Sequence, residues 1–260
     1  MEDEFEKTIQ ELVRNFKPKN EKPLKWWMEK NALIWHVVHR LYGNSDHFKY
    51  TENFKEYRRS SASASWKTGV LLIDYGVMPT HLHDLVIVPS FEALSSYLRR
   101  TDISYTRKRL NMKGRDGMPI QTTPVFDGKP YCTPMGSVRQ TYETLRYIHN
   151  NPKKWNEKYP DNPVSINEKT GLYWKSSAWQ RSHGTHDFSF DGNLLLNMTG
   201  KTWPELLELY TMGREDFDKN VKEIEDSMSE AQKNNFLKIN PNKKWTMDIS
   251  GLMVPEDECD

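Results

Sequence analysis

Residues 69–88, GVLLIDYGVMPTHLHDLVIV, contain two runs of apolar residues on either side of a short turn. The first run covers residues 69–78, and the second covers residues 81–88. Pro79 and Thr80 form the whole connection, and two strands joined this tightly must pair antiparallel. The stretch therefore predicts a β-hairpin, and the other elements are placed around it.

Hydrophobic periodicity predicts a strand and two helices next to this hairpin. Residues 32–41, ALIWHVVHRL, are rich in β-branched and aromatic side chains and are typical of a strand. The polar residues 46–65, which end in SSASAS, are expected to hold a helix and then a loop. After the hairpin, Ser90 is a typical N-cap for a helix that runs to about residue 110.

Residues 111–136 are punctuated by Gly and Pro and are too long for a mere connector. Ser137 then predicts the N-cap of a helix, VRQTYETLRYIHNN, which Pro152 is expected to end. The order is strand, helix, strand, strand, helix, a strand or irregular loop, and helix. It predicts an α+β fold with helices on one face of an antiparallel sheet, close to the ferredoxin-like plan.

The 260 residues are expected to divide into three regions. Residues 1–30 are expected to be a helical extension with a helix over 3–16, and residues 31–182 are expected to be the domain that contains the hairpin. Residues 183–260 are expected to be a mainly helical extension of two or three helices. Its acidity favours packing or a protein contact over phosphate binding.

The composition narrows the class of protein. No window approaches the roughly 20 apolar residues of a membrane span, and the acidic N-terminus does not resemble a signal peptide. Cys132 and Cys259, the only cysteines, provide neither a disulfide framework nor a thiolate metal site. We expect a cytoplasmic protein with no membrane partner.

Two histidines, His81 and His83, flank Leu82 at the start of the second strand. Positions i and i+2 of a strand point to the same face, and two neutral imidazoles side by side can bind a divalent cation. A bare H-x-H is more often a pair of ordinary histidines. His36 and His39 face opposite sides of the earlier strand, so both are interpreted as structural.

The segment V-M-P-T-H-L-H-D-L-V, residues 77–86, resembles the V-M-P-N-H-x-H-L-L-V signature of the REP-associated tyrosine transposases, which belong to the HUH single-strand endonucleases. Thr80 replaces the usual Asn. Asp84 replaces a hydrophobe, and it could alter the surroundings of the metal or lie at a solvated edge. Two later segments match in order: residues 146–152 resemble R-Y-I-x-x-N-P, and residues 173–178, YWKSSA, resemble Y-P-W-S-S-A.

The resemblance implies the HUH endonuclease fold and a metal-dependent transposase that cuts and rejoins single-stranded DNA. It implies that Tyr147 is the nucleophile, which would form a 5′-phosphotyrosine and leave a free 3′-OH. It implies that His81, His83 and Asn151 hold the cofactor, Mg²⁺ or Mn²⁺.

Other interpretations stay open. Tyr147 could be a core tyrosine beside Leu145 and Ile148, and Asn151 could simply end the helix before Pro152. A domesticated nickase or a replication-initiation-like endonuclease would use the same residues, and a non-catalytic DNA-binding protein could retain them. A phosphohydrolase that uses the H-x-H pair would leave the tyrosine segment unexplained.

The expected partner is single-stranded DNA, and the resemblance implies that it carries a hairpin. Exposed bases stack on aromatic side chains beside a basic track. Residues 98–115 carry seven Lys and Arg against one Asp, although a solvated helix face explains this charge equally well. We expect a monomer or homodimer associated with the nucleoid of a bacterial or phage-like system. The candidate track is Arg99, Arg100, Arg107, Lys108, Arg109, Lys113 and Arg115, and the candidate stacking platforms are Trp174, Trp179 and Tyr131.

Overall fold

A computed structural model describes residues 33–88, 91–111, 125–128, 130–135, 137–183, 195, 201–228, 245–247 and 253–255. The strands are β1 Leu33–Arg40, β2 Leu71–Val77, β3 His81–Val88, β4 Tyr131–Pro134, β5 Trp245–Met247 and β6 Met253–Pro255. The helices are α3 Thr51–Thr68, α4 Phe91–Asn111, α5 Val138–Lys158, α6 Ser177–Ser182, α8 Trp203–Thr211 and α9 Arg214–Ser227, with short 3-10 turns η1 Tyr42–Asn44 and η2 His47–Lys49.

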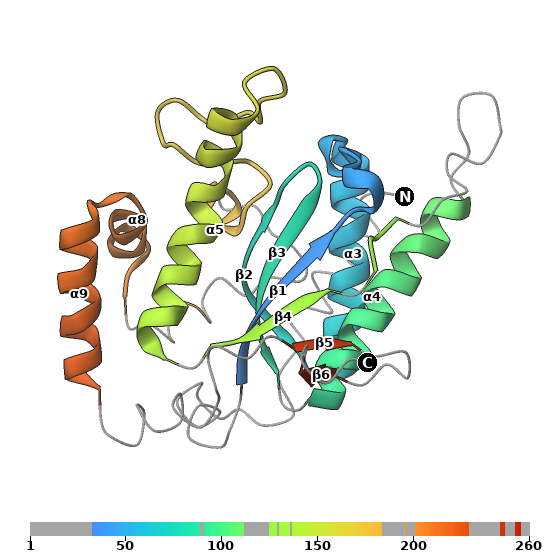
Figure 1. Cartoon of the computed structure of the whole chain (residues 1–260), viewed down its shortest axis with the longest axis horizontal. Helices are drawn as coiled ribbons and strands as arrows, with labels where there is room; N and C mark the ends of the chain where they lie inside the picture. The colour runs from blue at the N-terminus through green and yellow to red at the C-terminus, as the bar shows by residue number, and fades with distance from the viewer. Residues whose placement is uncertain are drawn as a thin grey trace.

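The predicted hairpin is β2 and β3, and it lies in one antiparallel sheet of order β2-β3-β1-β4-β5-β6 (Figure 1). β3 pairs with β1 from Leu33↔Val88 to Arg40↔His81, and β1 pairs with β4 on its other side. Every pairing between the described strands is antiparallel, as expected for this α+β class. The predicted α+β class is therefore confirmed.

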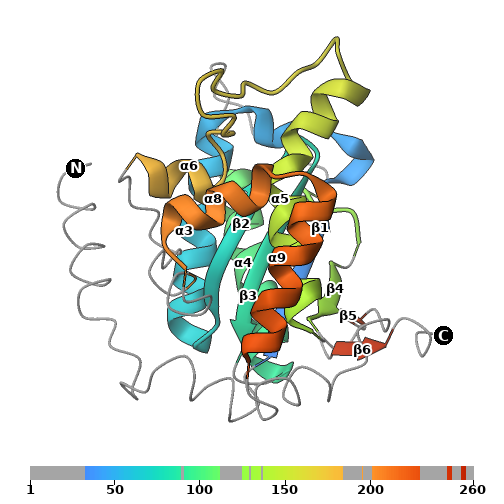
Figure 2. The same ribbon diagram turned by 90° about the vertical axis from the view of Figure 1, so that its left-hand side faces the viewer.

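The sheet is covered on both faces, which corrects the expectation of helices on one face only. Helices α3 and α4 lie on one face, and α5 lies on the other with α8 and α9 outside it (Figures 1 and 2). In β2 and β3 every side chain after the first residue is buried. Strands with both faces buried need a helical layer on each side, because an exposed apolar face would remain in water.

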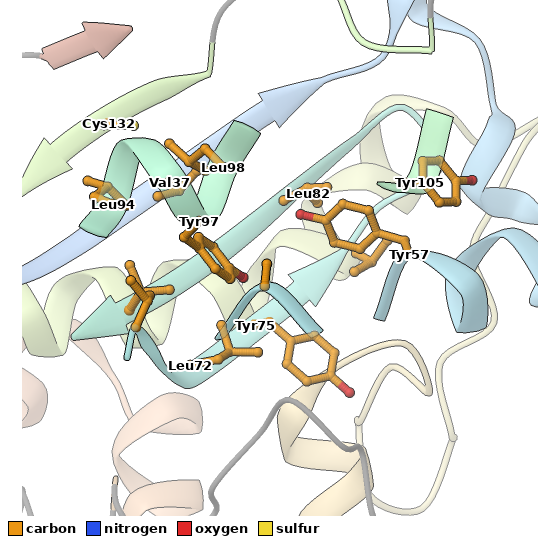
Figure 3. Packing of buried hydrophobic residues seen from close by; sticks show 14 of the residues in the cluster. Val37, Tyr57, Leu72, Tyr75, Leu82, Leu94, Tyr97, Leu98, Tyr105 and Cys132 are labelled. Atoms are coloured by element: carbon orange, nitrogen blue, oxygen red, sulfur yellow. The ribbon is translucent and has the colours of Figure 1, made fainter. Parts of the chain in front are cut away.

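Alternate residues of β3 belong to the two layers. Leu82 packs with Leu94 and Tyr97 of α4 in one apolar cluster (Figure 3). Leu85 packs with Leu145 of α5 in the other cluster. This alternation places His81 and His83 on the α5 face, because they share the parity of Leu85.

Helix α3 continues through the SSASAS run, where a loop was predicted, and ends at Gly69 with φ of +73°. The small side chains of Ser61 and Ala64 are buried, so α3 and α4 can approach closely. The Ser61 hydroxyl lies 2.6 Å from the Tyr97 hydroxyl and satisfies it inside the layer. Helix packing therefore overrides the low helix propensity of this run.

Helix α5 begins where predicted but does not end at Pro152. The Ser137 side chain accepts a hydrogen bond from the Gln140 amide, which confirms the N-cap. The helix then continues to Lys158, with Pro152 inside it. Trp155 packs with Met78 and Tyr173, and this contact holds the last turns in place.

Helices α8 and α9 lie in the described part of the C-terminal region and pack against α5 (Figure 2). Packing was one of the outcomes expected for this region. Strands β5 and β6 extend the sheet in a region expected to be mainly helical. The predicted helix over 3–16, the Ser90 cap and most of the 111–136 loop lie outside the described residues. No described helix is long and apolar enough to cross a membrane.

Candidate metal and nucleophile site

A close contact between α5 and β2 sets the position of the site. Gly76, Val38 and Tyr131 are in register with His83 across β2, β1 and β4, so all four point to the α5 face. A Cβ on Gly76 would lie 3.0 Å from Cγ2 of Ile148, tighter than ordinary contact. The glycine therefore lets α5 pass directly over the sheet, next to the histidines.

Four of the predicted side chains converge at this crossing. The Asn151 amide nitrogen Nδ2 lies 2.9 Å from His83 Nε2 and 3.3 Å from His81 Nε2. The ring centroid of Tyr147 lies 5.3 Å from that of His83. The two histidines, the asparagine and the tyrosine named from the sequence thus form one cluster.

The outer nitrogen of each imidazole also has a partner. His81 Nδ1 lies 3.1 Å from Thr80 Oγ1, and His83 Nδ1 lies 3.0 Å from His36 Nε2. In the tautomer that satisfies all these contacts, each Nδ1–H donates outward and each Nε2 accepts from Asn151. Both Nε2 lone pairs then face one point, as a pair of metal ligands requires.

His36 lies in the site, although the sequence interpretation treated it as structural. Its ring stacks on His83 with centroids 5.2 Å apart and an interplanar angle of 17°. His39, the other histidine of β1, faces α4, is buried, and lies 3.4 Å from a carboxylate oxygen of Asp102. From the sequence, the alternation of side chains along β1 shows only that His36 and His39 face opposite sides. It does not show that β1 lies next to β3, which is what brings His36 to His83.

Burial keeps these imidazoles neutral. It lowers the pKa of His36 from 6.5 to about 4. Burial, helped by the charge of Arg40, also lowers the pKa of His81 from 6.5 to about 4. Burial and the neighbouring His36 and His81 hold the pKa of His83 well below 6.5. Neutral histidines keep the lone pairs that bind a cation.

The donor set fits a divalent cation that accepts nitrogen and oxygen. Within the described residues no three His, Cys, Asp or Glu side chains are grouped to hold a metal ion. The cluster instead contains two imidazoles and an amide, whose oxygen and nitrogen can exchange places by a flip. This mixed set suits Mn²⁺ somewhat better than Mg²⁺, which prefers oxygen ligands.

Tyr147 is a surface residue rather than a core tyrosine. Its side chain is 40% exposed, whereas Leu145 and Ile148 on the same helix are buried. The Lys154 ammonium lies 5.3 Å from the centre of the Tyr147 ring. Asn151 lies inside α5 and does not end the helix. Both alternative interpretations of this segment are therefore wrong.

His149, two residues from the tyrosine, points elsewhere. Its Nε2 lies 2.9 Å from a carboxylate oxygen of the buried Asp74 on β2. Its ring stacks on Tyr210 of α8 with centroids 4.3 Å apart. These contacts fasten α5 between the sheet and the outer helices.

Asp84 lies neither at a solvated edge nor beside the histidine nitrogens. It is buried on the α3 and α4 face, 3.2 Å from the Arg58 guanidinium, and accepts a hydrogen bond of 3.3 Å from Tyr57. Arg58 neutralises the Asp84 carboxylate and Tyr57 donates a hydrogen bond to it, so an acid can be buried at this position.

The third matching segment, residues 173–178, supports the hairpin. The Tyr173 hydroxyl donates a 2.9 Å hydrogen bond to the Val77 carbonyl. The Ser177 hydroxyl donates to the Asp74 carboxylate and accepts from the Tyr75 amide. These bonds fix the end of β2, directly before the turn that leads to the histidines.

The predicted stacking platforms lie in different environments. Trp174 is half-buried and packs edge-on against Phe54, with ring centroids 5.6 Å apart. Trp179 stacks on His183, with centroids 3.7 Å apart. Tyr131 is 41% exposed on the face of the sheet that holds the histidines.

The structure does not bring the predicted basic track to the histidines. The track belongs to α4, which lies on the opposite face of the sheet (Figure 1). Lys108 forms an ion pair with Glu56 of α3. Arg99, Arg100 and Arg107 are exposed on α4, whereas Lys113, Arg115 and the side chain of Arg109 lie outside the described residues.

Comparisons with known proteins give only distant structural similarity. No protein-family model matches the chain, and no curated protein is significantly similar in sequence. A solved structure described as a REP-associated tyrosine transposase bound to a REP hairpin matches with a TM-score of 0.42 and 14% identity. The match covers 63% of this chain and 87% of that chain. The function of this chain therefore has to follow from its own residues.

Proposed function

We propose that the protein is a metal-dependent endonuclease and strand transferase for single-stranded DNA, with Tyr147 as its nucleophile. The observation that carries this proposal is the convergence of two neutral imidazoles and an amide beside an exposed tyrosine. The resemblance of residues 77–86 and 146–152 to tyrosine transposases supports the same assignment.

His81, His83 and Asn151 are the residues that would hold Mg²⁺ or Mn²⁺. A divalent cation supplies polarisation of the scissile P–O bond and neutralises charge that develops on the phosphate. The three side chains are neutral, so they leave the positive charge for the anionic substrate. Thr80 and His36 hold the two imidazoles in the orientation that presents Nε2.

Tyr147 supplies the attacking oxygen. A bond forms between its hydroxyl oxygen and phosphorus, the bond from phosphorus to the 3′ oxygen breaks, and the tyrosine proton is given up as the 3′ oxygen gains one. The downstream fragment stays joined to the tyrosine through its 5′ phosphate, and the upstream fragment leaves with the free 3′-OH. Attack of a 3′-OH on this ester reverses the step, so rejoining needs no ATP.

The surroundings of Tyr147 suit a nucleic acid strand. An exposed side chain on the outer edge of α5 can reach a backbone phosphate without rearrangement of the core. The Lys154 ammonium beside the ring adds positive charge at the point where a phosphate would arrive. Hairpin-bearing repeat DNA is the substrate that we propose from the motif resemblance.

The proposal is tested with an end-labelled, hairpin-bearing single-stranded oligonucleotide and Mg²⁺ or Mn²⁺. We expect a labelled protein–DNA adduct on a denaturing gel, and we expect EDTA or His83→Ala to abolish it. Cleavage without an adduct would contradict the tyrosine mechanism and favour a hydrolase. DNA binding without cleavage would contradict the enzyme and favour a binding protein.

A further inference from the structure

The face of the sheet that carries the histidines opens beyond α5. On β1 the residues that point to this face become more exposed along the strand: Ile34 is buried, His36 and Val38 are half-buried, and Arg40 is exposed. Tyr131 of β4 pairs with Val38 and is 41% exposed. The sheet therefore presents a surface that starts at the histidines and runs toward β4.

Arg40 and Tyr131 form a pair on this surface. The guanidinium carbon of Arg40 lies 5.5 Å from the centre of the Tyr131 ring, which is cation–π geometry. Arg40 is in register with His81, and Tyr131 lies two strands from His83, or roughly 10 Å at the usual strand spacing. The pair is thus contiguous with the site.

A second cation, the Lys154 ammonium, lies 5.3 Å from the centre of the Tyr147 ring. Lys154 follows Tyr147 by seven residues on α5, so both lie on one stripe of the helix together with Asn151. Neither Lys154 nor Arg40 forms an ion pair with another residue in the described part of the chain. Their charges are available to an anionic ligand.

We propose that Arg40 and Tyr131 bind the DNA strand next to the scissile phosphate. Tyr131 stacks on a base, Arg40 contacts the adjoining phosphate, and Lys154 contacts the backbone beside Tyr147. This inference rests on the proposed function of the same site and names the surface that positions its substrate.

The chemistry of the surface favours a single strand over a duplex or a protein. An exposed aromatic ring offers a stacking partner to a base face, which a duplex keeps inside its own stack. Arg40 and Lys154 form no ion pair with a described residue, and two such cations near the site match the negative charge of a backbone. Val38 is half-buried and lies between His83 and Tyr131 in the sheet, where it adds apolar surface.

The test is equilibrium binding of the full chain to a fluorescein-labelled single-stranded oligonucleotide, measured by anisotropy in EDTA so that no cleavage occurs. Tyr131→Ala should weaken binding by roughly 5- to 150-fold, the range expected for loss of one base stack. Arg40→Ala should reduce the slope of log K against log salt by about 0.7, the value for one phosphate contact on a single strand. Tyr131→Trp should restore binding.

Trp66→Ala and Lys67→Ala are matched controls, because both residues are exposed on the last turn of α3 on the far face of the sheet. We expect both controls to bind DNA as the wild type does. Wild-type affinity in Tyr131→Ala and Arg40→Ala, with an unchanged circular dichroism spectrum, would overturn the proposal. Equal loss for the matching duplex would overturn the stacking role.

Failure of this surface and failure of the proposed function give different results. Normal adduct formation with no effect of Tyr131→Ala or Arg40→Ala on binding overturns the surface and keeps the enzyme. DNA binding that depends on Tyr131, without any adduct when Mn²⁺ is added, supports the proposed binding surface and contradicts the proposed enzymatic function. A wild-type chain that binds no single-stranded DNA overturns both.

Discussion

His83 and Asp84 are neighbours on β3, yet they belong to two different kinds of polar environment. Asp84 faces α3 and α4, where Arg58 neutralises its charge and Tyr57 donates a hydrogen bond. His83 faces α5, where its pKa is held below the ordinary value and its Nε2 meets an amide. Both side chains are almost completely buried, at 3% and 1% exposure.

The difference teaches that burial alone does not separate a structural polar group from a functional one. On the closed face, Arg58 and Tyr57 are themselves buried, so the charge is matched inside the core. On the α5 face, the neighbour of the buried imidazole is Tyr147, which reaches solvent. Lone pairs that converge beside an exposed tyrosine favour the proposed chemistry, whereas a charge closed between buried partners indicates a contribution to stability.

The largest difference between the two faces of the sheet is expected when one tyrosine hydroxyl group is removed from each face. Tyr147→Phe keeps the ring but removes the attacking oxygen, so adduct formation should fall by at least about 10³-fold. Tyr57→Phe removes the donor to Asp84 and should leave cleavage intact while it costs about 1–3 kcal/mol of stability. Both are measured with a labelled oligonucleotide and urea denaturation; equal loss of cleavage in the two variants would contradict the comparison.

Asp84→Ala should act on stability and not on metal binding. It leaves the buried Arg58 guanidinium without its carboxylate, and loss of one partner of a buried pair costs about 3–5 kcal/mol. Urea denaturation measures the loss, and titration calorimetry with Mn²⁺ should give wild-type affinity. A clear drop in Mn²⁺ affinity would mean that the two faces are not independent.

His36→Ala should act on metal binding. The variant removes the acceptor for the Nδ1–H of His83, and loss of such an outer partner lowers metal affinity by roughly 10- to 100-fold. His39→Ala, on the opposite face of the same strand, is the matched control and should keep the affinity. Calorimetry with Mn²⁺ compares the two variants. Equal Mn²⁺ affinities for His36→Ala and His39→Ala would show that His36 does not contribute to the metal site.

The smallest expected effect is a pH dependence of the metal-free protein. Burial lowers the pKa of His36 and of His81 from 6.5 to about 4 in the folded chain, whereas the unfolded chain keeps the ordinary pKa. Between these values the unfolded chain binds more protons, so the free energy of unfolding should fall as pH falls from about 6.5 to about 4. Urea denaturation across this range should show a shallower decline for His36→Gln; an unchanged slope would contradict the assignment.

Local rules predicted the parts of the site that lie on single elements. The i, i+2 spacing of a strand put His81 and His83 together, and the i, i+4 spacing of a helix put Asn151 beside Tyr147. The apolar runs and the Pro-Thr turn predicted the hairpin. These features depend on residues close in sequence.

Features that depend on contacts between distant segments could not be read from the sequence. His36 reaches His83 because β1 lies next to β3, and no local pattern gives that strand order. The sequence also does not show that the basic residues of α4 lie on the face of the sheet opposite the histidines. Local rules predict that Pro152 ends α5. The packing of Trp155 against Met78 and Tyr173 stabilises the turns beyond it, so the helix continues.

Mass spectrometry of the trapped protein–DNA adduct is the most direct test of the central claim. The chain contains twelve tyrosines, so the position of the DNA remnant identifies the nucleophile without reference to a variant. After incubation with the hairpin oligonucleotide and Mn²⁺, nuclease trimming and proteolysis, we expect the remnant on Tyr147, and no remnant in EDTA. A remnant on another tyrosine, or cleaved DNA without any modified tyrosine, would contradict the account.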